Sequence, residues 1–112
     1  MASRIAILAS GKKATDIIIL EMGETVGYTD FFVIATASNP RLTRAVGEEI
    51  QGQLRDARRR PARVEGEREG EWVLLDYLDV VVHIFTPTAR DFYRLETLWG
   101  DVPREAGPVL ED

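Results

Sequence analysis

The sequence predicts an α+β (mixed α/β) domain with a single mixed β-sheet of about five strands flanked by helices. The main observation is that residues 30–37 and 80–85 are apolar on both alternating faces, apart from His83. Strands of this kind are covered on both sides of a sheet, so both are expected to be central. A second observation is the long segment between them, whose apolar residues recur at helical spacing and supply a covering helix.

The first half of the chain predicts a short helix, two strands and a long helix. Residues 5–9 place apolar side chains on one side, and residues 16–21 and 30–37 are strand-like runs separated by a loop that contains glycine. Asn39 is a favourable N-cap and Pro40 a favourable first helical residue. The helix that they begin carries an apolar stripe made of Leu42, Val46, Ile50 and Leu54.

The second half predicts three strands and a C-terminal helix. Residues 62–66 suit a short edge strand, and residues 72–75 and 80–85 are strands joined across four residues. The pair Thr86-Pro87 begins a helix that is expected to reach about residue 99. We therefore expect one domain over residues 1–100 and a loosely ordered C-terminal tail over residues 101–112.

The join between the last two strands is unusual. The middle of a tight hairpin normally carries Gly, Asn or Asp, whereas here Tyr77 and Leu78 lie between Asp76 and Asp79. An apolar tip between two acids is either buried beneath a neighbouring element or offered to a partner. The acids themselves allow recognition of a basic surface.

Composition and charge narrow the function classes. The chain has 112 residues, a net charge of −5 and no cysteine, and it lacks both a signal-peptide core and an apolar run long enough for a membrane span. We expect a cytoplasmic protein with little direct nucleic-acid binding. One local cluster of positive charge contrasts with the negative net charge; it consists of Arg55, Arg58, Arg59, Arg60 and Arg63. These cations either complement the dipole at a helix end or form an RNA-binding module.

Residues with catalytic potential are few. His83 is the single histidine, and it is interpreted as a core or contact residue. The sharpest chemical candidates are Asp76 and Asp79, with Glu65, because paired carboxylates hold magnesium in phosphoryl and nucleotidyl transfer. Their spacing does not aim both aspartates from one strand face, and no Gly-Ser phosphate-binding turn accompanies them. We expect no enzyme activity, cofactor or metal, and keep a magnesium-dependent nucleotidyltransferase as the alternative.

Several segments, in a fixed order, resemble a known family. They are residues 16–20, residues 29–38 followed by Arg41, residues 64–66, residues 72–77, residues 79–85 and residues 90–99. Together they closely resemble the ribosomal silencing factor family, also called Iojap-like, over nearly the whole chain. The resemblance implies a fold similar in outline to nucleotidyltransferases but without their catalytic residues.

The resemblance also implies a function. Family members bind the large ribosomal subunit through its protein numbered fourteen, block joining with the small subunit, and so repress translation when nutrients are scarce. Homodimers are implied off the ribosome. The implied contact comprises Trp72, Asp76, Tyr77, Leu78 and Asp79, which we expect to cluster at one strand end. The family pattern has Gly where this chain has Leu78, which predicts a different turn or a larger apolar contact.

Overall fold

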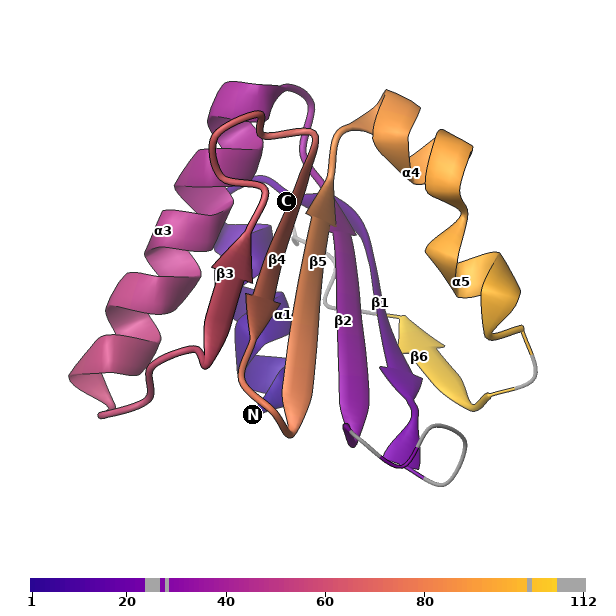
Figure 1. The fold of residues 1–112 in the computed structure, drawn as a ribbon, viewed down its shortest axis with the longest axis horizontal. Helices are drawn as coiled ribbons and strands as arrows, with labels where there is room; N and C mark the ends of the chain where they lie inside the picture. The colour runs from indigo at the N-terminus through magenta and orange to yellow at the C-terminus, as the bar shows by residue number, and fades with distance from the viewer. Residues whose placement is uncertain (24–26, 28, 101, 107–112) are drawn as a thin grey trace.

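The computed structural model describes residues 1–23, 27, 29–100 and 102–106. Six described strands form one mixed sheet in the order β3-β4-β5-β2-β1-β6 (Figure 1). The described elements are α1 (Ala2–Gly11), β1 (Thr15–Glu21), β2 (Phe31–Thr36), α3 (Pro40–Asp56), β3 (Arg63–Glu65), β4 (Trp72–Asp76), β5 (Val80–Phe85), α4 (Pro87–Tyr93), α5 (Leu95–Leu98) and β6 (Arg104–Ala106). The predicted α+β class with a single mixed sheet is confirmed.

The centre of the sheet is the parallel pair β2–β5. Their register runs from Phe31 opposite Val80 to Thr36 opposite Phe85, and the other described strand pairs are antiparallel. Every residue of β5 is buried, as β-branched and aromatic side chains on both faces of a strand require. The predicted central position of this strand is therefore confirmed.

Helices cover the two faces of the sheet unequally. α1 and α3 lie together on one face, where Ile5, Ile50, Val33 and Val82 belong to one buried cluster. A smaller cluster occupies the other face under α4 and α5 and includes Phe32 and Phe85. In Figure 1, α4 and α5 lie towards the β2–β1–β6 side, and the described contact of α4 with β4 on this face is the packing of Tyr93 against Trp72.

The start of α3 follows the predicted capping chemistry. The Asn39 side-chain oxygen accepts a hydrogen bond from the Leu42 backbone N–H at 2.9 Å, and Pro40 is the first helical residue. The stripe residues Val46, Ile50 and Leu54 are buried against the sheet. None of the helices described here is both long enough and apolar enough to cross a membrane.

The C-terminal region differs from the prediction at two points. The expected helix over residues 87–99 is wrong as a single element, because Arg94 adopts the left-handed conformation (φ 48°, ψ 48°) and separates α4 from α5. The sequence also gave no sign of β6, which pairs with β1 within the expected tail. Residue 101 and residues 107–112 of that tail lie outside the described residues, so the boundary at residue 100 stays a prediction.

Candidate partner-binding site

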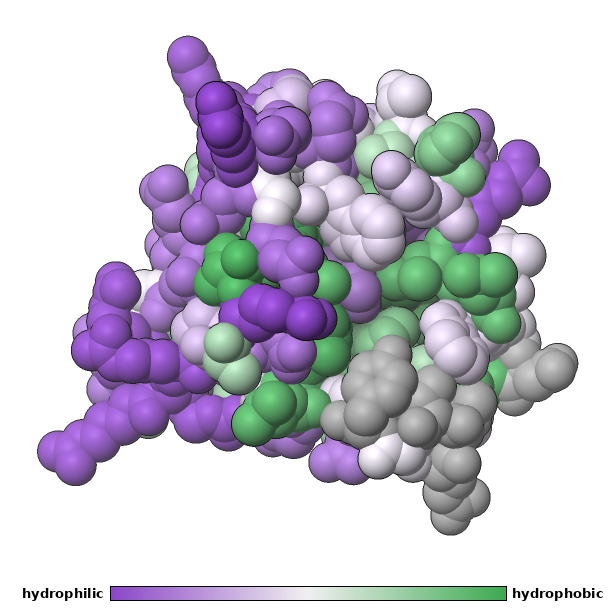
Figure 2. All heavy atoms as spheres, in the orientation of Figure 1, coloured by the Kyte–Doolittle hydropathy of each residue, from purple (hydrophilic) through white to green (hydrophobic). Residues whose placement is uncertain are grey.

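The exposed part of the sheet centres on alternate residues of β4. Val73 and Leu75 point towards α3 and are fully buried, whereas Trp72, Leu74 and Asp76 point to the other face and are partly exposed. We call these last three residues the β4 face. Figure 2 shows hydrophilic side chains over α3, apolar and hydrophilic ones side by side in the middle, and a mixture of apolar and intermediate ones around α4 and α5. Among the described residues, Trp72 of the β4 face lies against Tyr93 of α4, whereas Leu74 and Asp76 remain partly exposed.

The hairpin tip, residues 77–79, combines a buried and an exposed apolar side chain. Tyr77 is 3% exposed and belongs to the cluster on the α1–α3 face, whereas Leu78 is 65% exposed. The turn is closed by the Tyr77 N–H donating to the Val80 carbonyl at 2.9 Å, and the Leu78 N–H donates to the Asp76 carboxylate at 2.9 Å. Leu78 has a φ of +73°, which side-chain-bearing residues adopt at a cost. Burial is therefore confirmed for Tyr77, whereas contact of the exposed Leu78 with a partner stays a prediction.

The predicted contact residues do not all lie together. Trp72 begins β4 and Asp76 ends it, so about 13 Å of extended strand separates Trp72 from the tip. The expectation that all five residues gather at one strand end is wrong for Trp72. It is Trp72 and Asp76 that share the β4 face, while Leu78 and Asp79 extend it at the tip.

Both predicted acids face arginines from the cluster that follows α3. Arg59 Nη2 lies 2.7 Å from Asp79 Oδ1 and also donates to the Tyr77 carbonyl, and Arg63 Nη2 lies 3.8 Å from Asp76 Oδ2. Burial raises the pKa of the Tyr77 hydroxyl, and the nearby charge of Arg59 opposes this rise. Neither acid is an isolated negative charge. Within the described part of the chain, no three acidic or histidine side chains gather into a possible metal site.

Trp72 is held by an aromatic cluster on the open side of the sheet. Its ring lies 5.0 Å from that of Phe85 and 4.7 Å from that of Tyr93, between ring centroids. Its indole N–H donates to Nδ1 of His83 at 3.1 Å. Burial lowers the pKa of His83 to about 3, which keeps the ring neutral at physiological pH. The interpretation of His83 as a core residue is confirmed by its 4% exposure.

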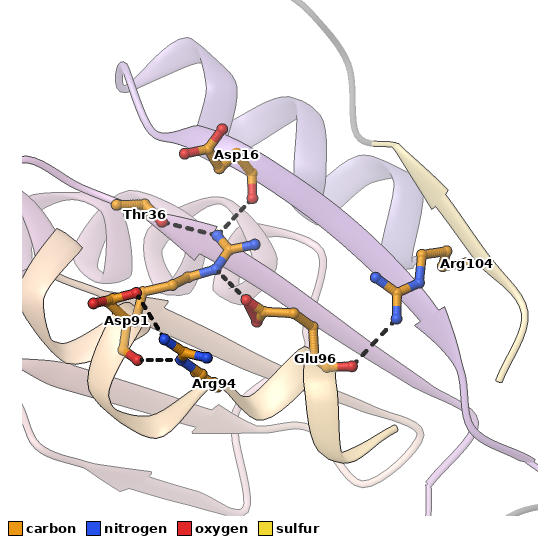
Figure 3. Close-up of polar contacts among 7 residues, drawn as sticks. Asp16, Thr36, Asp91, Arg94, Glu96 and Arg104 are labelled. Atoms are coloured by element: carbon orange, nitrogen blue, oxygen red, sulfur yellow. Dashed lines mark hydrogen bonds and ion pairs between the residues drawn. The ribbon is translucent and has the colours of Figure 1, made fainter. Parts of the chain in front are cut away.

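Sequence reasoning missed a second polar centre, around Arg90. The side chain of this residue is 14% exposed, and its Nε lies 3.2 Å from Glu96 Oε1. Its Nη1 donates to the Asp16 carbonyl at 2.6 Å and to the Thr36 hydroxyl at 2.8 Å (Figure 3). One guanidinium therefore joins α4 to α5, β1 and β2. Its partners lie far apart in sequence, so local pattern gives no signal of them.

Comparison with known proteins decides the family. The family model described as "Ribosomal silencing factor during starvation" matches residues 1–112. The chain belongs to the ribosomal silencing factor family. The predicted resemblance is thus confirmed, and this member has an α+β fold with a partly open sheet face.

One silencing factor, one solved structure and one mitochondrial protein are each similar to this chain. The chain is 37% identical over 98 residues to ribosomal silencing factor RsfS of Bacillus subtilis, covering 88% of this chain and 83% of that protein. A crystal structure of a Chromobacterium violaceum protein superposes with a TM-score of 0.84 at 33% identity, covering 98% of this chain and 88% of the other. A mouse protein is named for mitochondrial assembly of the ribosomal large subunit; it is 28% identical over 91 residues, which are 79% of this chain and 40% of that protein.

Acidification is expected to weaken this silencing factor through His83. Its pKa is about 3 in the folded chain against 6.5 ordinarily, so below about pH 6.5 the unfolded chain binds a proton that the folded chain does not. The contribution of His83 to the free energy of unfolding is fully present above that pH and is lost as the pH falls towards 3. Between about pH 7.5 and pH 5 the expected loss is about 2 kcal/mol. Urea unfolding at several pH values measures it, and His83→Gln should flatten the slope; an equal slope in that variant would contradict the assignment.

Replacement of Leu78 by glycine is expected to stabilise the hairpin tip. The left-handed backbone costs a side-chain-bearing residue about 1–2 kcal/mol, and glycine's greater freedom in the unfolded chain offsets roughly 0.5–1 kcal/mol of that gain. Leu78→Gly should therefore raise the free energy of unfolding by about 0.5–1 kcal/mol. Leu78→Ala is the matched control, since it removes the exposed side chain but keeps the strained backbone. Equal stability of the two variants in urea unfolding would exclude strain at this residue.

Proposed function

We propose that this protein is a non-enzymatic translational repressor that binds the large ribosomal subunit and sterically blocks its joining with the small subunit. The observation that carries the proposal is the β4 face, where Leu74 and Asp76 are partly exposed, with a half-buried tryptophan against α4 at one end and an exposed leucine at the adjoining tip. Aromatic and apolar residues of this kind form the centres of protein interfaces. Membership of the silencing factor family supports the ribosome as partner.

The separation of Trp72 from the tip suits a protein partner. A standard interface buries about 800 Å² on each side, so one partner surface easily spans about 13 Å along β4. Binding at a subunit-joining surface needs no chemistry, because the bound body excludes the other subunit by its volume. Affinity sufficient to compete with subunit joining is the requirement. The name of the mouse relative supports the large subunit as the one bound.

The electrostatic contribution is expected to act at long range. Asp76 and Asp79 are each close to an arginine, so the contact itself has little free charge. The net charge of −5 remains, and it favours approach to a basic ribosomal protein over the surrounding RNA. We propose the large-subunit protein numbered fourteen as the direct partner, in the cytoplasm, with little direct contact to nucleic acid.

We also propose that the protein is a homodimer when it is off the ribosome. Sedimentation equilibrium of the purified protein tests this directly. A monomer at all concentrations up to those used in subunit binding would exclude the dimer without affecting the proposal of ribosome binding.

Substitutions at the two ends of the proposed contact should each weaken binding strongly. Trp72→Ala removes the aromatic anchor, and Asp79→Lys places a cation beside Arg59 at the tip. Each is expected to lower affinity for the large subunit by at least about tenfold while leaving the circular dichroism spectrum unchanged. Glu48→Lys makes the same charge change at an exposed position of α3 and serves as the control. Co-sedimentation with purified large subunits is the measurement.

Two results would reject the proposal. One is full joining of purified subunits at excess wild-type protein in a sucrose gradient. The other is wild-type affinity in both folded variants, which would place the contact elsewhere. Turnover of labelled nucleotides with magnesium that is lost in Asp76→Asn would instead favour the nucleotidyltransferase alternative.

A further inference from the structure

His83 contacts Trp72 from inside the sheet. It lies in β5 opposite Leu74, while Trp72 lies opposite Phe85, so the two side chains form a diagonal cross-strand pair on the open face. The imidazole is itself fixed, with the Phe32 ring edge-on at 4.6 Å and the Phe85 ring stacked at 6.3 Å between centroids. The acceptor for the Trp72 indole N–H is thus a buried group with little freedom to move.

The hydrogen bond between Trp72 and His83 determines which tautomer the imidazole adopts. Nδ1 accepts the indole N–H at 3.1 Å, so the proton of the neutral ring resides on Nε2. Nε2 is buried and has no hydrogen-bond partner among the described residues. Formation of the Trp72 contact therefore selects one tautomer, at the cost of leaving a buried N–H unpaired. A side chain that served packing alone would not require this arrangement.

The consequence for Trp72 concerns which edge reaches solvent. The indole has one polar atom, Nε1, and His83 engages it on the inner side. The exposed part of Trp72 is therefore carbon, suited to an apolar contact. The hydrogen bond acts together with the packing against Phe85 and Tyr93 to fix the orientation of the ring.

We propose that His83 is a positioning residue for partner binding: its Nδ1 holds the indole N–H of Trp72 inwards, so that the apolar edge of the tryptophan faces the partner. The orientation stands on the geometry of this chain alone, whereas its consequence for affinity rests on the proposed function. His83 itself does not touch the partner. It acts through Trp72.

Nuclear magnetic resonance of the wild-type protein tests the orientation without any partner. With uniform ¹⁵N labelling, a scalar coupling across the N–H···N bond is expected between Trp72 Nε1 and His83 Nδ1. The His83 nitrogen shifts should show Nε2 protonated and Nδ1 bare at neutral pH. Trp99 is the internal control, because its buried indole nitrogen has no partner among the described residues. Absence of the coupling at Trp72, or protonation of Nδ1, would overturn the proposal.

Two variants then connect orientation to affinity. His83→Leu removes the acceptor and is expected to move the Trp72 indole signal towards the unbonded position and to weaken large-subunit binding by about tenfold. His83→Gln offers an amide oxygen as acceptor and is expected to recover most of both. Trp72→Phe and Trp99→Phe assign the two indole signals.

The outcomes separate the two proposals. If His83→Leu releases the indole but binds like the wild type, positioning is overturned while the proposed function stands. If His83→Leu does not fold, wild-type affinity in His83→Gln with the Trp72 indole signal at its unbonded position would overturn it in the same way. If the wild type itself fails to bind large subunits although the coupling is present, the proposed function fails and the orientation survives.

Discussion

Replacement of Gly66 by alanine is expected to lower the free energy of unfolding by about 3 kcal/mol. Gly66 follows β3 with a φ of +83°, and a Cβ atom there would lie 1.8 Å from the carbonyl oxygen of Trp72. The obstacle is backbone rather than a flexible side chain, so β3 and the start of β4 would have to separate. Chemical denaturation measures the loss.

Gly11→Ala is the matched control for this effect. Gly11 is the last residue of α1, and nothing lies within 4 Å of a Cβ atom added there. Alanine favours helix over glycine, so this variant should be as stable as the wild type or slightly more stable. Similar losses in both variants would show that the clash with Trp72 is not the cause.

Replacement of Arg90 by methionine is expected to destabilise the fold by about 3 kcal/mol. The Arg90 guanidinium contacts three acceptors, and its loss would leave the Glu96 carboxylate without a counter-charge. The second carboxylate oxygen of Glu96, Oε2, is already buried and has no hydrogen-bond partner among the described residues. Methionine keeps the length of the aliphatic chain, so the cost reports the lost polar contacts. Thermal and urea unfolding measure it.

Arg94→Met provides the comparison on the neighbouring position. The Arg94 side chain is 68% exposed and lies 3.9 Å from Asp91, a surface pair whose loss should change stability by less than about 0.5 kcal/mol. Adding Glu96→Gln to Arg90→Met should restore part of the stability, because it removes the stranded charge. No recovery in the double variant would show that packing, rather than the ion pair, explains the loss.

Local chemistry made much of the fold predictable. β2 and β5 were identified from runs that are apolar on both faces, and the start of α3 from Asn39 and Pro40, because these signals depend on neighbours in sequence. The break at Arg94 was not predictable, since arginine has no preference for a left-handed backbone. β6 was missed because three residues in a tail carry no periodic pattern.

The candidate site was predictable in composition but not in arrangement. Trp72 and the tip residues were recognised from their types and from the family resemblance, and the rise of an extended strand already implies that Trp72 lies far from Asp79. The pairing of Asp79 with Arg59 was not predictable, because it brings the end of α3 against a turn twenty residues later. The role of His83 likewise depends on strand register, which sequence leaves undetermined.

The parallel pairing of β2 with β5 has a consequence for folding order. Phe31 pairs with Val80, so the centre of the sheet closes only after α3, β3 and β4 have been made. The antiparallel pairs β1–β2 and β4–β5 join neighbouring strands and are expected to form first, as two separate hairpins. During synthesis, the apolar β2 therefore presents an unpaired edge until residue 85 leaves the ribosome. The slow step should be the docking of the two hairpins.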